Sequence, residues 1–383
     1  MAARAARLRE QGHRVFAFGV GEPDFPTPAF IRDAAKKALE AGGCSHYTAV
    51  TGTAALKKAI CVATERDRGW TPTPEQIVVS CGAKHALFNL ALALYEPGDE
   101  VIIPAPYWVS YPEQVRLVGA TPVIVPTREE DNWLVSPDAL GKALTPRTKA
   151  LILCTPSNPT GAAYPRERLL DLAKILSASD AYVIVDEIYA ELVYDDFRHY
   201  SLAALAPGLR DRLIVVDGVS KTYAMTGWRI GWSISPPALA KALDVIQGQS
   251  TTNPTALSQE AATHALTGPR DDIARMRAAF SERRNRMVTG LRSVPGVRCR
   301  LPDGAFYAFA DVSGLYGLRA GEKTLATDED VAFWLLDAAH VAAVPGSPFG
   351  APGYLRFSYA SSIETIDEGL AAFRGAVEKL RSK

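Results

Sequence analysis

The sequence predicts an α/β fold, with a mostly parallel, doubly wound sheet in a large domain and a second, smaller α+β domain. Between about residues 75 and 235, short runs rich in Val, Ile and Leu alternate with stretches of helical character. Runs that are apolar on both sides are typical of parallel strands covered by helices on both faces. After residue 275 the pattern changes to a long helix followed by short strands and further helices.

Each expected element follows from its own composition. The strands are β-branched runs that end near Gly, Pro, Asn or Asp, and the helices are longer segments with mixed apolar and polar faces. The expected large-domain strands are 76–80, 100–103, 150–154, 182–185 and 213–216, with helices at 83–94, 113–118 and 166–176. The expected small-domain elements are a helix at 275–292 and strands at 305–309 and 354–359. We place the large domain at 35–275 and the small domain at 1–34 and 276–383.

Composition excludes several classes of function. The 383 residues contain 42 basic and 42 acidic side chains, so no basic field favours nucleic acid or a membrane surface. The five cysteines are scattered and form no C-x-x-C pair, which argues against a disulfide scaffold or a zinc site. No apolar run approaches the ~18 residues of a membrane span, and the Arg-rich start continues into an apolar run. We therefore expect a cytoplasmic protein whose first residues are helical.

Polar side chains follow three of the expected parallel strands. Asn158 comes after 150–154, Asp186 ends 182–185, and Lys221 follows 213–216. Taken one at a time, Asn158 is explained as a turn residue, Asp186 as a helix cap and Lys221 as a solvent-exposed lysine. Ligands bind at the carboxyl ends of such strands, however, so the three side chains should meet. Together with Arg229, they suit pyridoxal phosphate, which needs a lysine for its aldehyde, a carboxylate for its ring nitrogen and an anion site.

The segment 80–85 offers an anion site of its own. Gly82 and Ala83 lie where a strand turns into a helix, so that exposed N–H groups and the helix dipole would favour a phosphate. An ordinary strand-to-helix turn explains the same residues. Lys84 fits that explanation poorly, because a cation in the first turn opposes the dipole unless an anion lies nearby.

Motifs of rival sites are absent from the sequence. The segment 18–24 begins like G-x-G-x-x-G but ends in Asp24, and there is no G-x-x-x-x-G-K-[ST] motif. Six histidines without H-E-x-x-H spacing predict no metal site.

Several strings occur together in one order along residues 15 to 380. They are Gly21–Phe25, Tyr107–Tyr111, Ser157–Gly161, Asp186–Tyr189, Ser220–Arg229, Gly304–Tyr307 and Leu355–Tyr359. In this combination the chain resembles the class I, fold-type I pyridoxal-phosphate aminotransferases, in the branch of the bacterial aspartate aminotransferases. The resemblance implies the fold described above and a reaction that alternates between two forms of the cofactor.

The resemblance implies a role for each residue around the cofactor ring. Lys221 would bond to the cofactor aldehyde and, once released, carry the proton between the substrate Cα and the cofactor. Asp186 would keep the ring nitrogen protonated. Asn158 and Tyr189 would donate hydrogen bonds to the phenolate oxygen. Trp108 would stack on the ring.

The resemblance also implies that Arg229 and the N–H groups of Gly82 and Ala83 hold the cofactor phosphate. Tyr47 matches a tyrosine that reaches the phosphate from a neighbouring subunit, and residues 252–253 match others at that interface. A homodimer is therefore expected.

For the substrate, the resemblance implies that Arg356 binds the α-carboxylate, with Gly21, Asn158 and Trp108 beside it. Lys84 matches the partner of a distal carboxylate. We therefore expect aspartate and glutamate as amino donors, with 2-oxoglutarate and oxaloacetate as oxo acids. The alternatives are a preference for aromatic amino acids or prephenate, a pyridoxal-phosphate β-lyase, and a non-catalytic regulatory protein on this scaffold.

Three features depart from the family pattern. The chain begins inside the expected first helix, so a segment that covers the substrate in relatives is expected to be missing or the start codon to be misplaced. Val20 and its neighbours replace a hydroxyl-bearing residue often found before Gly21. Gly218 stands where many relatives have a phosphate-binding serine, which would leave more of the phosphate binding to Arg229.

Overall fold

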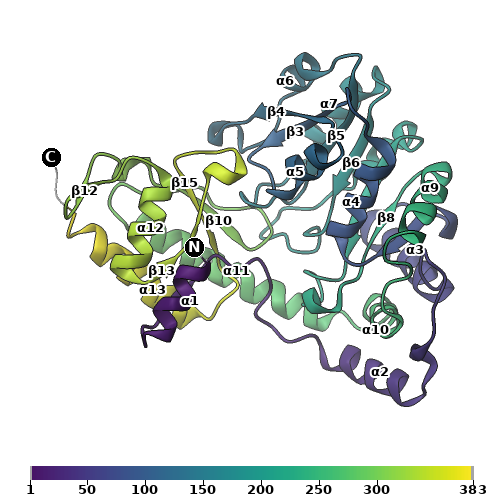
Figure 1. The fold of residues 1–383 in the computed structure, drawn as a ribbon, viewed down its shortest axis with the longest axis horizontal. Coiled ribbons are helices and arrows are strands. Elements are labelled where there is room, and N and C mark those ends of the chain that lie inside the picture. The colour runs from purple at the N-terminus through teal and green to yellow at the C-terminus, as the bar shows by residue number, and fades with distance from the viewer. Residues whose placement is uncertain (1, 381–383) are drawn as a thin grey trace.

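The computed structural model describes residues 2–380, and its largest sheet has seven strands (Figure 1). Five neighbouring strands run parallel, and one strand runs antiparallel to both of its neighbours. In spatial order they are β2 (Ile77–Ser80), β8 (Gly231–Ile234), β7 (Leu213–Gly218), β6 (Tyr182–Asp186), β5 (Thr148–Cys154), β3 (Glu100–Ala105) and β4 (Thr121–Pro126). The mostly parallel α/β sheet predicted from the sequence is confirmed.

The sequence prediction missed two strands of this sheet. β4 lies at the sheet edge and is largely open to solvent, so it lacks the continuous apolar pattern of a central strand. β8 has only four residues and pairs antiparallel with β2 and β7, so it separates β2 from the five parallel strands. The first residue of β8, Gly231, has to be a glycine, because a Cβ there would lie 2.2 Å from the Ala83 nitrogen.

Both faces of the sheet are buried under helices. Along β6, Val183 and Val185 pack into one apolar cluster, whereas Ile184 between them packs into the cluster on the other face. This alternation shows why the predicted strands are apolar at every position. The helices around this sheet are α3 (Ala54–Arg68), α4 (Ala83–Leu94), α5 (Ser110–Leu117), α6 (Pro137–Ala143), α7 (Arg166–Ser177), α8 (Leu202–Leu205), α9 (Pro237–Gly248) and α10 (Ala256–Thr267). α2 (Ala29–Glu40) packs against α10 rather than against the sheet.

A second core lies around a four-stranded sheet near the carboxyl end. Its strands are β14 (Val344–Pro345), β15 (Tyr354–Ser358), β10 (Tyr307–Asp311) and β9 (Arg298–Cys299), and its helices are α11 (Asp271–Arg292), α12 (Asp328–Ala339) and α13 (Ile363–Val377). β11 (Arg319–Ala320) and β12 (Lys323–Thr324) form a separate hairpin. β10 begins two residues after the expected strand, because Ala305 adopts a φ of +58° that no strand allows.

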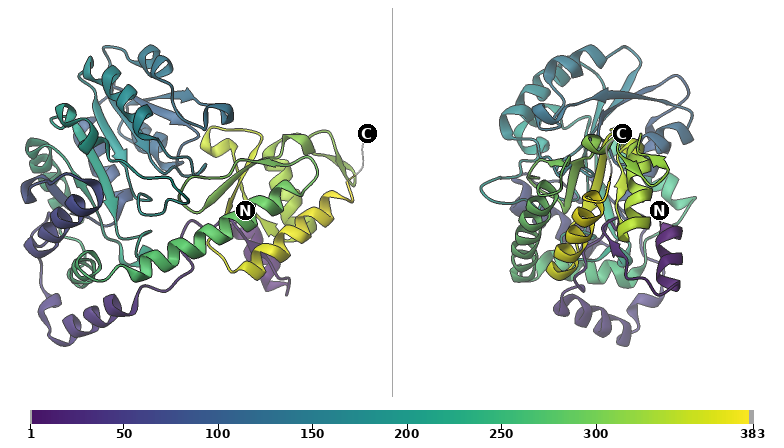
Figure 2. Two further views of the ribbon diagram at one scale, coloured as in Figure 1. Left: turned by 180° about the vertical axis from the view of Figure 1, so that it is seen from behind. Right: turned by 90° about the vertical axis from the view of Figure 1, so that its left-hand side faces the viewer.

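The first residues join this second core. β1 (Phe16–Ala17) pairs parallel with β13 (Val341–Ala342), and α1 (Ala2–Glu10) lies beside the carboxyl-terminal elements (Figure 2). The long α11 runs from the region of α10 towards this second core. No helix within residues 2–380 is long and apolar enough to cross a membrane.

Candidate active site

A cavity of about 580 Å³ lies between the carboxyl ends of the parallel strands and the second core. Its walls come from segments that are far apart in sequence. The expected site residues that line it are Gly21, Ala83, Lys84, Trp108, Asn158, Asp186, Tyr189, Lys221, Arg229 and Arg356. The parallel arrangement therefore brings these side chains to one place, as the sequence pattern predicts.

Lys221 follows the end of β7 and points its amine into the cavity. Its Nζ donates a hydrogen bond to the carbonyl oxygen of Gly21 over 2.7 Å. Burial lowers the pKa of Lys221 to about 8, against the Glu22 carboxylate, which raises it. The charges of Arg229 and Arg356 lower this pKa further. Lys221 therefore has an appreciable fraction of neutral, nucleophilic amine near pH 7 to 8.

Asp186 is the last residue of β6 and is almost fully buried. Its carboxylate accepts hydrogen bonds from the Tyr111 hydroxyl at 2.7 Å and from the Ile188 N–H at 3.1 Å. Burial raises the pKa of Asp186 to about 6, although both hydrogen bonds act to lower it. A cationic partner in the cavity would stabilise the ionised form of this carboxylate.

Arg356 lies on β15 and reaches across to the large sheet. It donates to the Asn158 Oδ1 at 2.8 Å and to the Gly19 carbonyl at 2.9 Å. Its guanidinium lies 4.5 Å from the centre of the Tyr307 ring. Its Nε is buried and has no hydrogen-bond partner among residues 2–380. The side chain is thus held in place with donor capacity left for an anion.

Two buried phenols face the same cavity. The hydroxyl groups of Tyr189 and Tyr307 lie 2.9 Å apart, within hydrogen-bond distance. Burial raises the pKa of Tyr189 well above its ordinary value, and the neighbouring Tyr307 raises it further. Both side chains therefore remain neutral at physiological pH and can donate a hydrogen bond.

The turn before α4 and Arg229 form one surface. Gly82 has a φ of +89°, and a Cβ at this position would lie 2.5 Å from Nη2 of Arg229. Arg229 donates to the carbonyl oxygens of Thr226 at 2.9 Å and Cys81 at 3.2 Å. The Gly82 N–H donates to the Ser80 carbonyl oxygen at 2.7 Å, and Gly82 does not line the cavity itself. Ala83, the first residue of α4, and Arg229 both line the cavity, and a helix start beside a guanidinium suits a phosphate.

Trp108 and Lys84 lie together on another wall of the cavity. The Lys84 Nζ is 4.9 Å from the centre of the Trp108 ring, and the side chain is exposed. Trp108 also contacts Tyr111 edge to face, with 5.4 Å between ring centres. Lys84 forms no salt bridge with a carboxylate within residues 2–380.

The structure does not bring Tyr47 or residues 252–253 into the cavity. Tyr47 is 89% exposed, and Thr252 is exposed with a φ of +56°. Gly218 also lies outside the cavity lining. A Cβ at Gly218 would lie 2.9 Å from the Gly231 Cα, so the β7–β8 pairing requires glycine there.

Several lining residues received no role from the sequence. Tyr111 stands three positions after Trp108 and directly contacts the Asp186 carboxylate, a spacing that could have indicated it. Ser220 precedes Lys221, and Glu22 follows Gly21. Their position next to predicted site residues could have indicated that they line the cavity. Other lining residues without an assigned role are Val20, Val109, Cys154, Ile188, Thr226, Tyr307, Val344 and Phe349.

The family model for aminotransferase class I and II matches residues 13–373. The chain belongs to this family. Its members use pyridoxal phosphate, so the predicted aminotransferase activity and cofactor are confirmed. The cofactor supplies an electrophilic aldehyde and a ring that accepts electrons. The depressed pKa of Lys221, the buried Asp186 and the surface formed by the start of α4 and Arg229 all fit this group.

Similar proteins cover almost the whole chain. The aspartate/prephenate aminotransferase of Cereibacter sphaeroides is 46% identical over 96% of this chain and 92% of its own. The aspartate aminotransferase of Geobacillus stearothermophilus is 44% identical over 95% and 91%, respectively. The crystal structure of the Rhizobium meliloti aspartate aminotransferase matches with a TM-score of 0.96 and 42% identity, covering 99% of this chain and 95% of that one. The predicted branch of bacterial aspartate aminotransferases is thereby confirmed.

Proposed function

We propose that this aminotransferase takes its amino group from aspartate or glutamate and passes it to 2-oxoglutarate or oxaloacetate. Two of the four cations that line the cavity, Lys221 and Arg229, are assigned to the cofactor. One observation carries the choice of substrate: the other two, Arg356 and Lys84, form no salt bridge with a carboxylate within residues 2–380. A dicarboxylic amino acid would supply one carboxylate to each. The names of relatives such as the Geobacillus stearothermophilus enzyme support the same choice.

The proposed roles follow from the contacts of each residue. Lys221 would hold the cofactor through its neutral amine and would carry the proton at the substrate Cα. Asp186 would pair with the ring nitrogen of the cofactor, while Tyr111 holds the Asp186 carboxylate in place. Tyr189 would donate a hydrogen bond to the phenolate oxygen of the cofactor. Arg356 binds the α-carboxylate through its planar fork, which Asn158 orients.

Replacing Lys84 with methionine is expected to separate distal-carboxylate binding from catalysis. A hydrogen bond to a charged group contributes ~1.5–3 kcal/mol, so kcat/KM for aspartate should fall by about 10- to 150-fold. The value for phenylalanine, which has no distal carboxylate, should change by less than about threefold. Steady-state kinetics with both amino donors measure the two effects.

The matched control for this variant is Lys142→Met. Lys142 is an exposed lysine on α6 that pairs with Asp138 and does not line the cavity. It should leave both kcat/KM values unchanged. A Lys84→Met enzyme that keeps its aspartate kcat/KM within about twofold would exclude Lys84 as the distal-carboxylate partner.

A second candidate substrate class is aromatic amino acids or prephenate. Part of the cavity wall is apolar, with Val20, Val109, Val344 and Phe349 among its residues. The Cereibacter sphaeroides relative is named as an aspartate/prephenate aminotransferase, and an aromatic aminotransferase from Pyrococcus horikoshii matches with a TM-score of 0.89 and 37% identity. The phenylalanine measurements above test this candidate at the same time.

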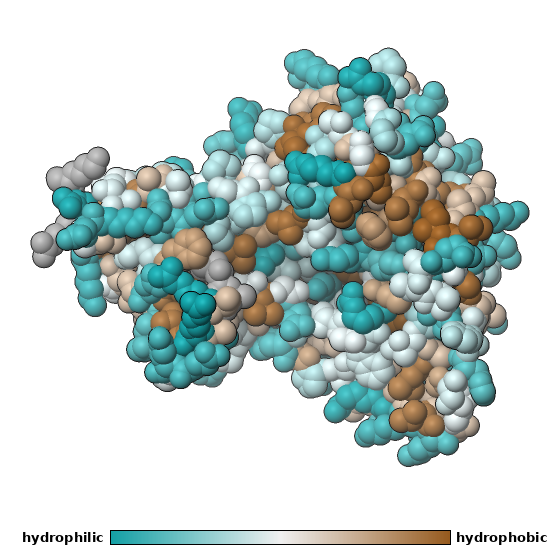
Figure 3. Space-filling model, in the orientation of Figure 1, coloured by the Kyte–Doolittle hydropathy of each residue, from teal (hydrophilic) through white to brown (hydrophobic). Residues whose placement is uncertain are grey.

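We further propose that the enzyme is a homodimer in which Tyr47 serves the neighbouring subunit's site. Tyr47 is almost fully exposed and outside its own cavity. Apolar residues also gather where α4, α5 and α9 reach the surface (Figure 3), with Leu92, Leu117 and Val245 exposed. Such a patch is typical of an interaction surface.

Mixing two defective variants is expected to restore activity if Tyr47 acts across an interface. In a mixed dimer of Lys221→Ala and Tyr47→Ala chains, one site carries both substitutions and the other carries neither. Activity at limiting cofactor should therefore rise above that of either variant alone after co-refolding. Sedimentation should show twice the chain mass. A monomeric enzyme, or a mixture no more active than its parts, would contradict the shared site.

A further inference from the structure

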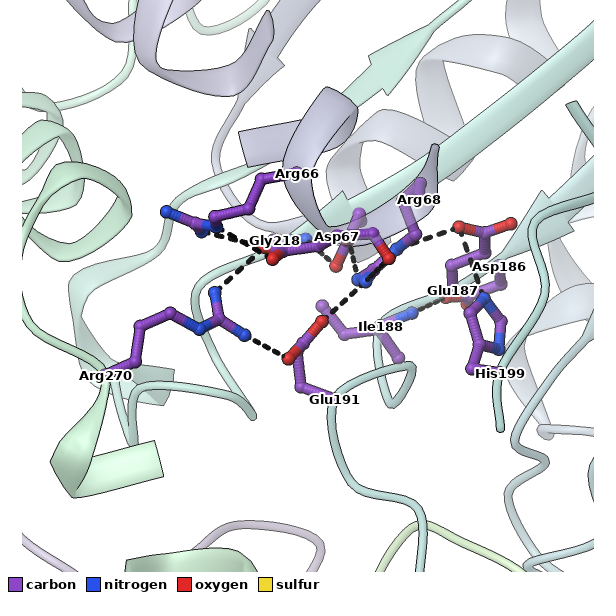
Figure 4. A network of polar contacts seen from close by, with 11 residues as sticks. Arg66, Asp67, Arg68, Asp186, Glu187, Ile188, Glu191, His199, Gly218 and Arg270 are labelled. Carbon is purple, nitrogen blue, oxygen red and sulfur yellow. Dashed lines mark hydrogen bonds and ion pairs between the residues drawn. The ribbon is translucent and has the colours of Figure 1, made fainter. Parts of the chain in front are cut away.

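A network of charged side chains lies beneath the candidate active site, outside the cavity lining (Figure 4). Its centre is Arg68, the last residue of α3, whose side chain is only 7% exposed. The other members come from α3, from the end of β7, from the segment that follows β6 and from the residue that precedes α11. They are Arg66, Asp67, Glu187, Glu191, His199, Asp217 and Arg270.

Arg68 contacts three carboxylates with its three nitrogens. Nη1 lies 2.6 Å from Glu191 and Nη2 lies 2.9 Å from Asp217, both as hydrogen-bonded ion pairs. Nε lies 3.1 Å from the fully buried Glu187 carboxylate, an ion-pair contact that lacks hydrogen-bond geometry. Figure 4 shows the guanidinium among these acidic groups. A lysine could not make the same contacts, because only the planar guanidinium has donors in a fixed fork.

Each of these carboxylates lies within four residues of a side chain that is assigned to the cofactor. Glu187 follows Asp186 directly, Glu191 lies two residues after Tyr189, and Asp217 lies four residues before Lys221. The strands themselves are neighbours, since the Glu187 N–H donates to the Val216 carbonyl at 2.8 Å. Arg68 therefore ties together the strand ends that carry the cofactor residues.

The network is better placed to fix geometry than to add stability. Burying charges costs solvation free energy, and buried ion pairs can often be replaced by apolar side chains without loss of stability. Arg270, which lies between α10 and α11, forms ion pairs with both Asp67 and Glu191. Glu191 is therefore held by two arginines. Held in this way, neighbouring strand ends can shift little relative to each other.

We propose that Arg68 is a positioning residue for the aminotransferase reaction, which holds Asp186, Tyr189 and Lys221 in register from beneath the cavity. The proposal rests on the site roles given under the proposed function. Arg68 touches neither cofactor nor substrate. It acts through Glu187, Glu191 and Asp217.

Arg68→Met and Arg68→Lys test this role in the full-length holoenzyme. A displacement of about 1 Å can cost about 100-fold in rate, so we expect kcat for aspartate at saturating cofactor to fall by roughly that factor in Arg68→Met. The visible circular dichroism of the bound cofactor, which reports its fixed orientation, should weaken per cofactor bound. Arg68→Lys keeps the charge without the fork, so it should fold and still show a large part of both losses.

Arg284→Met is the matched control. Arg284 is a buried arginine that pairs with Asp195 at 2.8 Å and has no contact with the network. It should lower the thermal midpoint while leaving kcat and the dichroism of the cofactor unchanged. The proposal is overturned if both Arg68 variants keep the wild-type kcat and dichroism, or if their losses equal those of Arg284→Met at a similar thermal midpoint. A wild-type enzyme that takes no amino group from aspartate or glutamate, while it accepts another amino acid, would instead overturn the proposed function.

Discussion

Lys221→Ala is expected to lower kcat by about 10⁴-fold or more, because it removes both the covalent anchor of the cofactor and the group that moves the proton. Within residues 2–380, the other lysine that lines the cavity is Lys84, and its side chain lies on the wall formed with Trp108. The variant should still take up cofactor through the surface around Gly82 and Arg229. Single-turnover measurements with aspartate give the rate.

The pH dependence of cofactor attachment tests the protonation state of Lys221. Only the neutral amine bonds to an aldehyde, and burial lowers the pKa of Lys221 to about 8. The rate of attachment to cofactor-free enzyme should therefore rise with pH and level off above about pH 8. A midpoint near the ordinary value of 10.5, or attachment in Lys221→Ala, would contradict the assignment.

Asp186→Asn is expected to produce the second largest effect, lowering kcat by about 30- to 5,000-fold. The substitution keeps the shape of the side chain but removes its charge. A desolvated charge pair that loses one partner costs ~2–5 kcal/mol, which is the basis for this range. Tyr111→Phe is the control, because it removes only the 2.7 Å hydrogen bond and leaves the carboxylate, so its loss should stay near tenfold or less. Equal losses in both variants would argue against the charge as the essential property.

The same variant should change how stability depends on pH in the cofactor-free protein. Burial raises the pKa of Asp186 from 3.8 to about 6, so the folded chain binds this proton more tightly than the unfolded chain. Its contribution to stability is therefore present below pH 4 and is lost as pH rises towards 6. Urea unfolding across this range should show a flatter decline in Asp186→Asn than in the wild type.

The sequence predicted the elements that form the buried sheet because their residues are apolar at every position. β5, β6 and β7 occur where they were expected, with ends shifted by at most two residues. The topology rule for such sheets then placed Asn158, Asp186 and Lys221 at one edge. The domain boundaries at 35–275 follow from composition and remain a prediction.

The elements missed from the sequence are those whose environment is set by contacts rather than pattern. β4 is an edge strand, and β8 is short and antiparallel. The roles of Tyr111 and Tyr307 depend on hydrogen bonds to residues 75 and 118 positions away, respectively. No local pattern records such distances.

The sequence alone predicted the family and the cofactor correctly, because these depend on residue types at strand ends and in short strings. The residues assigned to hold the cofactor remain a prediction. Only the tertiary structure decided how those residues are tuned and supported. The pKa of Lys221 depends on burial and on the charges of Glu22 and Arg356, which come from distant segments. Likewise, the contacts of Arg68 with three acidic residues form only when α3 packs against the sheet. Burial and electrostatic fields are properties of the packed molecule, and a linear pattern does not contain them.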